Sequence, residues 1–216
     1  MKIIKYSKSE EFLNILTHLL GFVLSLIFFL PLVISTYKEG DIVVFLAWLI
    51  YFIAIALMFL SSSLYHSMTN PLLRTIFRAI DHGVIYLTIA GSYTPVILIG
   101  LKSTFSIIIF VIIWILAITG ISMNIIAFAT GKEDRIGKAS MIIYMAMGWL
   151  SVLLLYQIYK YIGISYILYL VLGGLFYTIG AVFYAIKKIP YNHAIWHIFI
   201  LVAAFIMLYG NIKYLG

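Results

Sequence analysis

The chain has 216 residues, of which 65% are hydrophobic and only 10% are charged, and its mean hydropathy is +1.15. These values exclude an ordinary water-soluble domain and indicate an integral membrane protein. The net charge of +7 is carried by basic residues between apolar runs, so we assign it to topology and anionic lipid and expect no nucleic-acid partner. Since there is no cysteine, any metal site must use imidazole, carboxylate or water.

Seven apolar runs without strand-like alternation predict an all-α membrane protein, a seven-transmembrane-helix bundle forming a single domain over residues 1–216. The runs cover residues 12–35, 42–65, 77–101, 104–129, 139–159, 163–186 and 193–209. The first run is too long for the apolar part of a signal peptide and has no cleavage site after it, so we expect it to be retained as a span. Pro31 is expected to kink the first helix and Pro95 the third.

The distribution of basic residues predicts the orientation, because short loops rich in Lys and Arg stay in the cytoplasm. One side of the membrane receives Lys2, Lys5, Lys8, Arg74, Arg78, Lys132, Arg135, Lys138, Lys187 and Lys188. The other side receives only Lys38, Lys102, Lys160 and Lys213. This excess of basic residues on the first side places the N-terminus in the cytoplasm and, after seven spans, the C-terminus outside.

Ionisable residues gather on the cytoplasmic side of this predicted bundle. His193 and His197 are four residues apart, which on a helix brings both imidazoles to one face, close enough to hold one metal ion. His66 ends the second run and Asp81 begins the third, on the same side of the membrane. Because ionisable groups at membrane depth are costly and usually functional, this convergence predicts a site. His82 points about 100° away from Asp81 on a helix, so we do not assign it as a ligand.

Three imidazoles with an open water position are typical of a catalytic zinc site. Ser62 lies one helical turn before His66 and could orient a metal-bound water, while Asp81 could take up the proton that this water releases. Structural explanations remain open for each residue. The histidines could be interfacial or helix-capping groups, Asp81 could complement a helix dipole, and Ser62 could serve close helix packing.

A second polar cluster opens the first run. Glu11, Asn14 and His18 share one helical stripe, with Thr17 beside it, and they enter the membrane on the cytoplasmic side. These residues could line the same cavity as the histidines. They could equally form a capping and interface-anchoring group at the start of the helix.

Together these motifs resemble the hemolysin III family, the bacterial branch of the progestin and adipoQ receptors, over nearly the whole chain. The similarity rests on Glu11-x-x-Asn14-x-x-Thr17-His18, Ser62-x-x-x-His66, Asp81, Gly-Ser-Tyr-Thr-Pro at 91–95, and His193-x-x-x-His197, in that order. The resemblance implies a multi-pass protein of the bacterial cytoplasmic membrane, with its N-terminus inside and zinc near the cytoplasmic face. It implies that His66, His193 and His197 are the zinc ligands and that Asp81 and Ser62 contact zinc-bound water.

Three functions are compatible with these features. The first is a zinc-dependent hydrolase, similar to the ceramidases of the wider superfamily, that cleaves an amide or ester bond of a membrane lipid. The second is a cytolytic membrane protein, as the family name implies. The third is a sensor of membrane state in which zinc is structural. The expected partners are a membrane lipid as substrate and the lipid bilayer, and the sequence identifies no protein partner.

Overall fold

The computed structural model describes residues 6–101 and 103–216 and, within them, all side chains except those at 133–136 and 138. These residues contain no strand. The α-helices are α1 (Lys8–Glu39), α2 (Ile42–Ser67), α3 (Pro71–Pro95), α4 (Thr104–Ala129), α5 (Glu133–Trp149), α6 (Leu155–Tyr161), α7 (Ile164–Ala185) and α8 (Asn192–Leu215). A π-helix, η1 (Val96–Gly100), follows α3, and a 3₁₀-helix, η2 (Leu150–Leu154), joins α5 to α6.

Seven helical segments in the described part of the chain are long and apolar enough to cross a membrane. Two of them are composite, because η1 extends α3, and α5, η2 and α6 together form the fifth segment. The predicted all-α bundle of seven spans is therefore confirmed. Its orientation in the membrane stays a prediction, and Lys2, Lys5 and Lys102, which entered the count of basic residues, lie outside the described residues, as do the side chains of Arg135 and Lys138.

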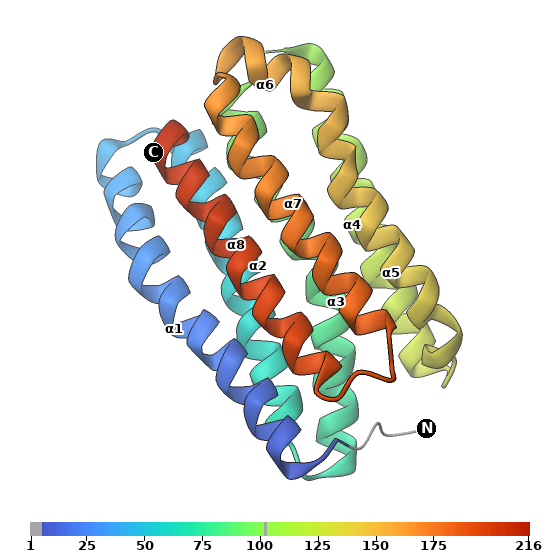
Figure 1. Ribbon diagram of the computed structural model, residues 1–216. Coiled ribbons are helices and arrows are strands. Elements are labelled where there is room, and N and C mark those ends of the chain that lie inside the picture. The colour runs from blue at the N-terminus through green and yellow to red at the C-terminus, as the bar shows by residue number, and fades with distance from the viewer. Residues whose placement is uncertain (1–5, 102) are drawn as a thin grey trace.

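The helices lie side by side along the bundle, with α1, α2 and α8 packed together on one side and α4 and α5 on the other (Figure 1). One group of buried side chains, including Phe29, Trp48 and Ile200, joins α1, α2 and α8. Another group, including Tyr86 and Ile113, joins α3 to α4 and the helices beyond it. The start of α1 and the end of α8 lie at opposite ends of the bundle (Figure 1).

Capping residues determine where α1 and α3 begin. Ser7 caps α1 in a capping box, in which its side chain accepts from the backbone N–H of Glu10 while the Glu10 carboxylate accepts from the backbone N–H of Ser7. Asn70 caps α3, and Pro71 occupies the first turn. The third helix therefore begins at Pro71, before the predicted apolar run at 77–101, because the cap and not hydropathy fixes where it starts.

The two prolines that were expected to kink helices have different outcomes. Pro31 lies inside α1, which continues through it to Glu39. Pro95 ends α3, and the wider π-helical turn of η1 follows directly. Proline has no N–H to bond the carbonyl one turn earlier, so a change of helix type at this point has a direct cause.

Glycines allow two helices to approach α2 closely. A Cβ atom added at Gly21 of α1 would lie 2.6 Å from ring carbons of Phe59 on α2. A Cβ atom at Gly91 of α3 would lie 2.8 Å from the Cβ atom of Ala54 on α2. Both distances are too short for real contacts, so these glycines fix α1 and α3 against the helix that carries His66.

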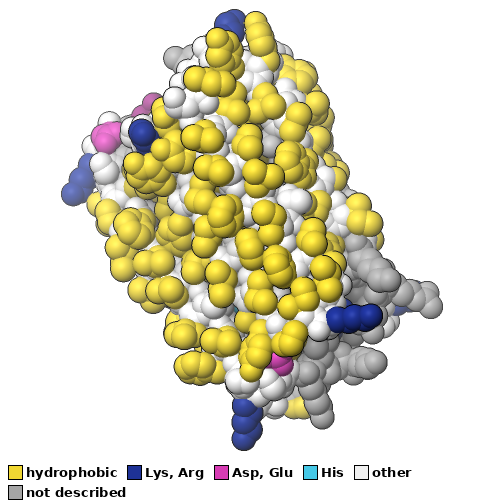
Figure 2. Space-filling view, in the orientation of Figure 1, with side chains coloured by type: hydrophobic (Ala, Val, Ile, Leu, Met, Phe, Trp, Pro, Cys, Tyr) yellow, Lys and Arg dark blue, Asp and Glu magenta, His cyan; other side chains and the backbone are white. Residues whose placement is uncertain are grey.

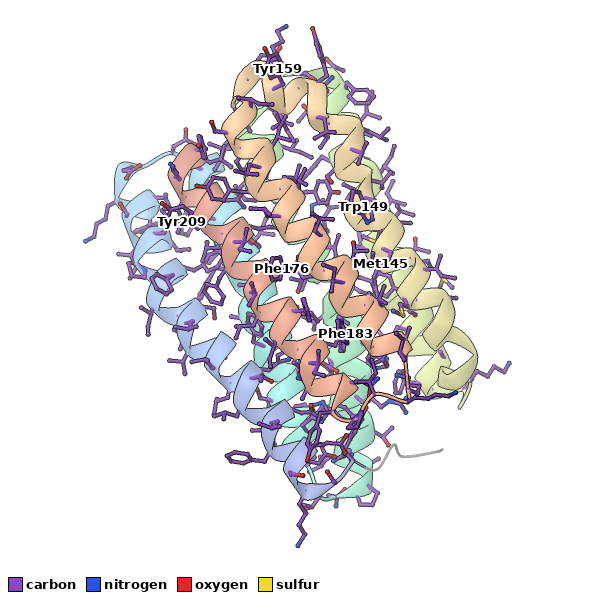
Figure 3. The ribbon with its side chains drawn as sticks, viewed as in Figure 1. Met145, Trp149, Tyr159, Phe176, Phe183 and Tyr209 are labelled. Atoms are coloured by element: carbon purple, nitrogen blue, oxygen red, sulfur yellow. The ribbon has the colours of Figure 1, made fainter. Side chains whose placement is uncertain are left out.

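The outer surface is apolar. Figure 2 shows one face covered by hydrophobic side chains, with charged side chains gathered toward its two ends. Trp149, Tyr159 and Tyr209, labelled in Figure 3, are respectively 43%, 60% and 57% exposed. Phe183 of α7 instead stacks on Phe199 of α8, with ring centroids 5.5 Å apart. An apolar belt of this kind fits a bundle surrounded by lipid.

Candidate metal centre

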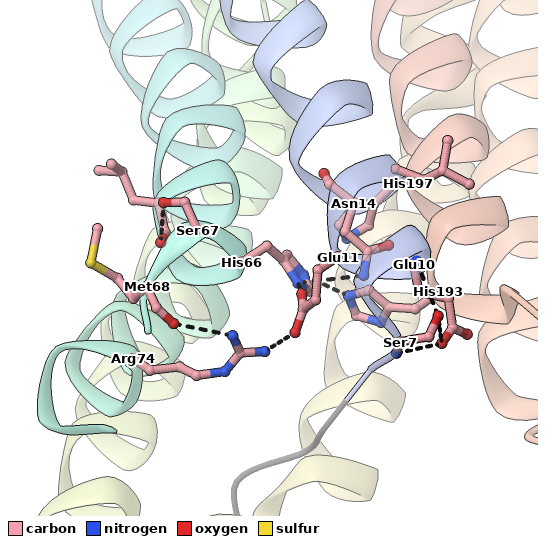
Figure 4. A network of polar contacts seen from close by, with 12 residues as sticks. Ser7, Glu10, Glu11, Asn14, His66, Ser67, Met68, Arg74, His193 and His197 are labelled. Carbon is pink, nitrogen blue, oxygen red and sulfur yellow. Dashed lines mark hydrogen bonds and ion pairs between the residues drawn. The ribbon is translucent and has the colours of Figure 1, made fainter. Parts of the chain in front are cut away.

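Three buried histidines converge at the end of the bundle where α2 ends and where α1, α3 and α8 begin (Figure 4). His66 lies at the end of α2, and His193 and His197 lie in the first turns of α8. Each offers a ring nitrogen, and these nitrogens all lie within 4.8 Å of one another. The Nε2 atoms of His66 and His193 are 3.1 Å apart. The structure thus brings together three histidines from two helices that are far apart in sequence.

The outer nitrogen of His66 has a carboxylate partner on α1. Its Nδ1 atom lies 2.7 Å from Oε2 of Glu11. The other carboxylate oxygen of Glu11 forms an ion pair with the guanidinium of Arg74, which also donates to the backbone carbonyl of Met68 at 3.2 Å. Figure 4 shows this chain of contacts running from α3 through α1 to His66. The polar stripe on α1 was expected either to share a site with the histidines or to cap and anchor the helix. These contacts favour the shared site.

His197 also has its outer partners on α1. Its Nδ1 atom lies 3.3 Å from the backbone carbonyl oxygen of Asn14 and 3.4 Å from the hydroxyl oxygen of Thr17. The Thr17 hydroxyl donates to the carbonyl of Leu13 at 2.8 Å, which leaves its oxygen free to accept. Both partners of Nδ1 are acceptors, so this nitrogen carries the proton and Nε2 keeps its lone pair.

Several buried polar atoms around the histidines have no hydrogen-bond partner among the described residues. They are Nδ1 of His193, Oδ1 of Asn14, the hydroxyl of Ser62 and both ring nitrogens of His18. Buried polar groups without partners cost free energy unless a ligand or water satisfies them. Their grouping at one end of the bundle is therefore what a polar site for a metal ion, water or substrate requires.

Ser62 and Asp81, which were predicted to contact zinc-bound water, are both buried near this end. Ser62 lies on α2 one turn before His66, and Asp81 lies in the first half of α3. Their exposed fractions are 1% for Ser62 and 7% for Asp81. Asp81 is not a member of the close cluster of His66, His193 and His197.

Tyr6, which precedes α1, lies against two rings of the cluster. Its ring centroid lies 5.1 Å from that of His193 and 5.7 Å from that of His66. Burial raises the pKa of Tyr6 well above its ordinary value, so the phenol stays neutral. The ring therefore shields the histidines without adding charge.

The donor set fits a zinc ion. Zinc accepts three imidazoles in catalytic sites, and metal-bound histidines almost always give their other ring N–H to a carboxylate or a backbone carbonyl. His66 and His197 have such partners in Glu11 and Asn14. No thiolate is present in the sequence to favour a softer metal.

A known protein family covers most of this chain. The family profile described as "Haemolysin-III related" matches residues 6–208, which include the three histidines and their partners. The chain belongs to this family. Its predicted membership in the hemolysin III branch of the progestin and adipoQ receptors is thereby confirmed. As a member of this family with seven spans, it is an integral membrane protein.

Relatives of this haemolysin-III related protein come from bacteria and mammals. Hemolysin-3 of Bacillus cereus is 36% identical over 205 residues, covering 95% of this chain and 91% of the relative. A Hemolysin-3 homolog of Bacillus subtilis (strain 168) is 36% identical over 196 residues, covering 91% and 90%. The monocyte to macrophage differentiation factor of Homo sapiens is 31% identical over 175 residues, covering 78% and 70%.

Sequence reasoning missed two features of this family member's site. Arg74 entered only the count of basic residues, although it pairs with Glu11 across two helices. Tyr6 was not considered, although it lies over two of the histidines. No local pattern marks either contact. The helical stripe of Glu11, Asn14 and His18 was the one signal that pointed toward α1.

Proposed function

We propose that this protein is a zinc-dependent hydrolase that cleaves an amide or ester bond of a membrane lipid, in a bacterial cytoplasmic membrane. The observation that carries the proposal is the convergence of three buried imidazoles from α2 and α8, with ring nitrogens within 4.8 Å of one another. Helix-end chemistry alone gives no reason for this geometry. The apolar surface of the bundle further supports a substrate that arrives from the bilayer.

His66, His193 and His197 would hold the zinc ion. When bound, zinc would supply a Lewis acid that polarises a carbonyl group and lowers the pKa of water to about 7. Oriented partners on the outer nitrogens of His66 and His197 keep the other nitrogens of these rings directed at the site. The ring of Tyr6, which lies against the imidazoles of His66 and His193, would limit the access of bulk water to them.

Asp81 and Ser62 would carry the proton and the developing charge. Asp81 accepts the proton of the attacking water and returns it to the leaving amine or alcohol. The Ser62 hydroxyl, which has no partner among the described residues, donates to the oxygen that gains negative charge at the carbonyl. One water is consumed, the carbonyl–nitrogen or carbonyl–oxygen bond breaks, and a fatty acid and an amine or alcohol leave.

The proposal is tested with purified protein loaded with zinc and given a panel of lipids with amide bonds and with ester bonds. Fatty-acid release is followed by mass spectrometry, with and without removal of zinc by a chelator. Release that stops on chelation and returns with zinc supports the proposal. A protein that holds zinc and cleaves no lipid of either class contradicts it and favours a structural zinc in a membrane sensor.

A cytolytic function is the second candidate, because the relative from Bacillus cereus bears the name Hemolysin-3. The variant His197→Ala, which removes one histidine of the cluster, distinguishes lysis from the chemistry of the metal site. If red-cell lysis by membranes containing the protein persists in this variant while zinc is lost, lysis is independent of the metal. If lysis and zinc are lost together, lysis follows from the chemistry of the site.

A further inference from the structure

We infer that Glu11 of α1 is a positioning residue for His66, and that α1 orients the metal centre without supplying a ligand. The inference rests on the proposed metal site and extends it to a helix outside the ligand set. All three histidines of the cluster lie on α2 and α8. The outer partners of two of these histidines lie on α1.

The contact between Glu11 and His66 selects one form of the imidazole ring. An ionised carboxylate only accepts hydrogen bonds, so Nδ1 of His66 is assigned as the donor to Oε2 at 2.7 Å, a much shorter contact than the 3.4 Å from the same Nδ1 to the amide nitrogen of Asn14. A neutral ring that carries its proton on Nδ1 keeps a lone pair on Nε2. That atom faces Nε2 of His193 at 3.1 Å, on the inner side of the cluster. Glu11 therefore directs the metal-binding nitrogen of His66 into the site.

Arg74 holds the carboxylate in place from the other side. Its guanidinium forms an ion pair with Oε1 of Glu11 and donates to the backbone carbonyl of Met68, which follows α2. It also lies over the ring of Tyr65, 5.0 Å from the centroid. The side chains of His66 and Glu11 are 0% and 19% exposed, so water competes little for the contact. These contacts limit rotation of the carboxylate and so fix the ring that it holds.

The same helix orients His197 through the backbone carbonyl of Asn14, three residues after Glu11. Two ligands on two different helices thus depend on the position of α1. Nδ1 of His193 has no partner among the described residues, so His193 is the ligand without an outer support. Removal of the Glu11 contact should weaken metal binding through His66 alone and leave the other two rings in place.

The test uses the full chain in detergent with two readouts. The first is the ¹⁵N chemical shifts of His66 in metal-free protein at pH 8, assigned by comparison with His66→Asn, which report which ring nitrogen carries the proton. The second is zinc affinity, measured by competition with a chelator. Glu11→Leu removes the acceptor, whereas Glu11→Gln keeps an acceptor oxygen without the charge. Glu39→Leu is the matched control, because Glu39 is another carboxylate of α1 and bonds Ser35 and no histidine.

In wild type and in Glu39→Leu we expect the His66 proton on Nδ1 and equal zinc affinity. In Glu11→Leu the proton should shift toward Nε2 and zinc affinity should fall by about 10- to 100-fold, the usual effect of losing an outer partner of a metal ligand. Glu11→Gln should retain the proton on Nδ1 and lose less affinity than Glu11→Leu.

Unchanged ¹⁵N shifts and unchanged affinity in Glu11→Leu would overturn the inference, as would an equal loss in Glu39→Leu. Neither readout depends on lipid hydrolysis, and the ¹⁵N shifts do not depend on zinc. A wild-type protein that cleaves no lipid would therefore defeat the proposed function and leave the role of Glu11 standing.

Discussion

The imidazole of His18 stacks on that of His197, with ring centroids 3.6 Å apart and ring planes inclined by 15°. His18 is buried, and neither of its nitrogens has a hydrogen-bond partner among the described residues. The ring of His18 also makes an edge-to-face contact with that of Phe59 on α2, with ring centroids 5.2 Å apart. Among the described residues, His18 therefore supports the predicted ligand His197 by packing and not by hydrogen bonding.

We expect His18→Phe to keep bound zinc and to unfold at the wild-type temperature or above, because Phe keeps the stacked ring and removes two unpaired polar atoms. His18→Ala should lower the free energy of unfolding by about 2–4 kcal/mol through the cavity it leaves. Zinc content and thermal unfolding in detergent measure both effects. Loss of zinc in His18→Phe would show instead that the nitrogens of His18 serve the site.

The ion pair between Arg74 and Glu11 should be coupled energetically. Arg74→Met leaves the carboxylate partly buried without its cation, so we expect a loss of about 1–3 kcal/mol in the free energy of unfolding. Adding Glu11→Gln removes the stranded charge, and the double variant should be more stable than the sum of the single effects predicts. Arg78→Met, one turn further along α3, is the control, and thermal unfolding is the measurement. Additive effects would contradict the coupling.

Asp81 and Ser62 should affect turnover without affecting metal content. Asp81→Asn removes the proton acceptor and should lower the rate of lipid hydrolysis by about 10²- to 10⁴-fold. Ser62→Ala removes one oxyanion donor and should lower it by about 10²- to 10³-fold. Both variants should retain zinc. Ser61→Ala is the matched control, because the Ser61 hydroxyl donates to the carbonyl of Met58 within α2. Zinc loss in Asp81→Asn would instead make Asp81 a ligand.

The predicted orientation places the C-terminus outside the cytoplasm. The start of α1 and the end of α8 lie at opposite ends of the bundle, as seven spans require (Figure 1). In a bacterial host, alkaline phosphatase fused after Gly216 should be active and green fluorescent protein fused there should be dark. A fluorescent fusion with an inactive phosphatase would reverse the orientation and place the histidines at the outer face.

The seven spans were predictable because each apolar run is long enough to cross a membrane, whatever its neighbours are. Helix ends were less predictable, since caps at Ser7 and Asn70 and not hydropathy set where α1 and α3 begin. The 3₁₀ segment Leu150–Leu154 has no proline to mark it. Its place within the fifth span depends on packing, which hydropathy does not report.

The candidate site was predictable in its residue types and only partly in its contacts. The spacing of His193 and His197 places them on one face of any helix. His66 was added because the predicted topology puts it on the same side of the membrane. The contact of His66 with Glu11 depends on how α1 packs against α2, which the close approach at Gly21 helps to set. Such a register between helices leaves no trace in the local sequence, so the role of α1 was left open.

The most direct test of the central claim is the zinc content of detergent-purified protein, measured by elemental mass spectrometry. The variants are His66→Ala and His197→Ala, with His82→Ala as a control, because His82 lies outside the close cluster. We expect about one zinc per chain in wild type and in His82→Ala, and loss of zinc in the other two variants. Absence of zinc from wild-type protein supplied with zinc, or its retention in both cluster variants, would contradict a metal centre formed by α2 and α8.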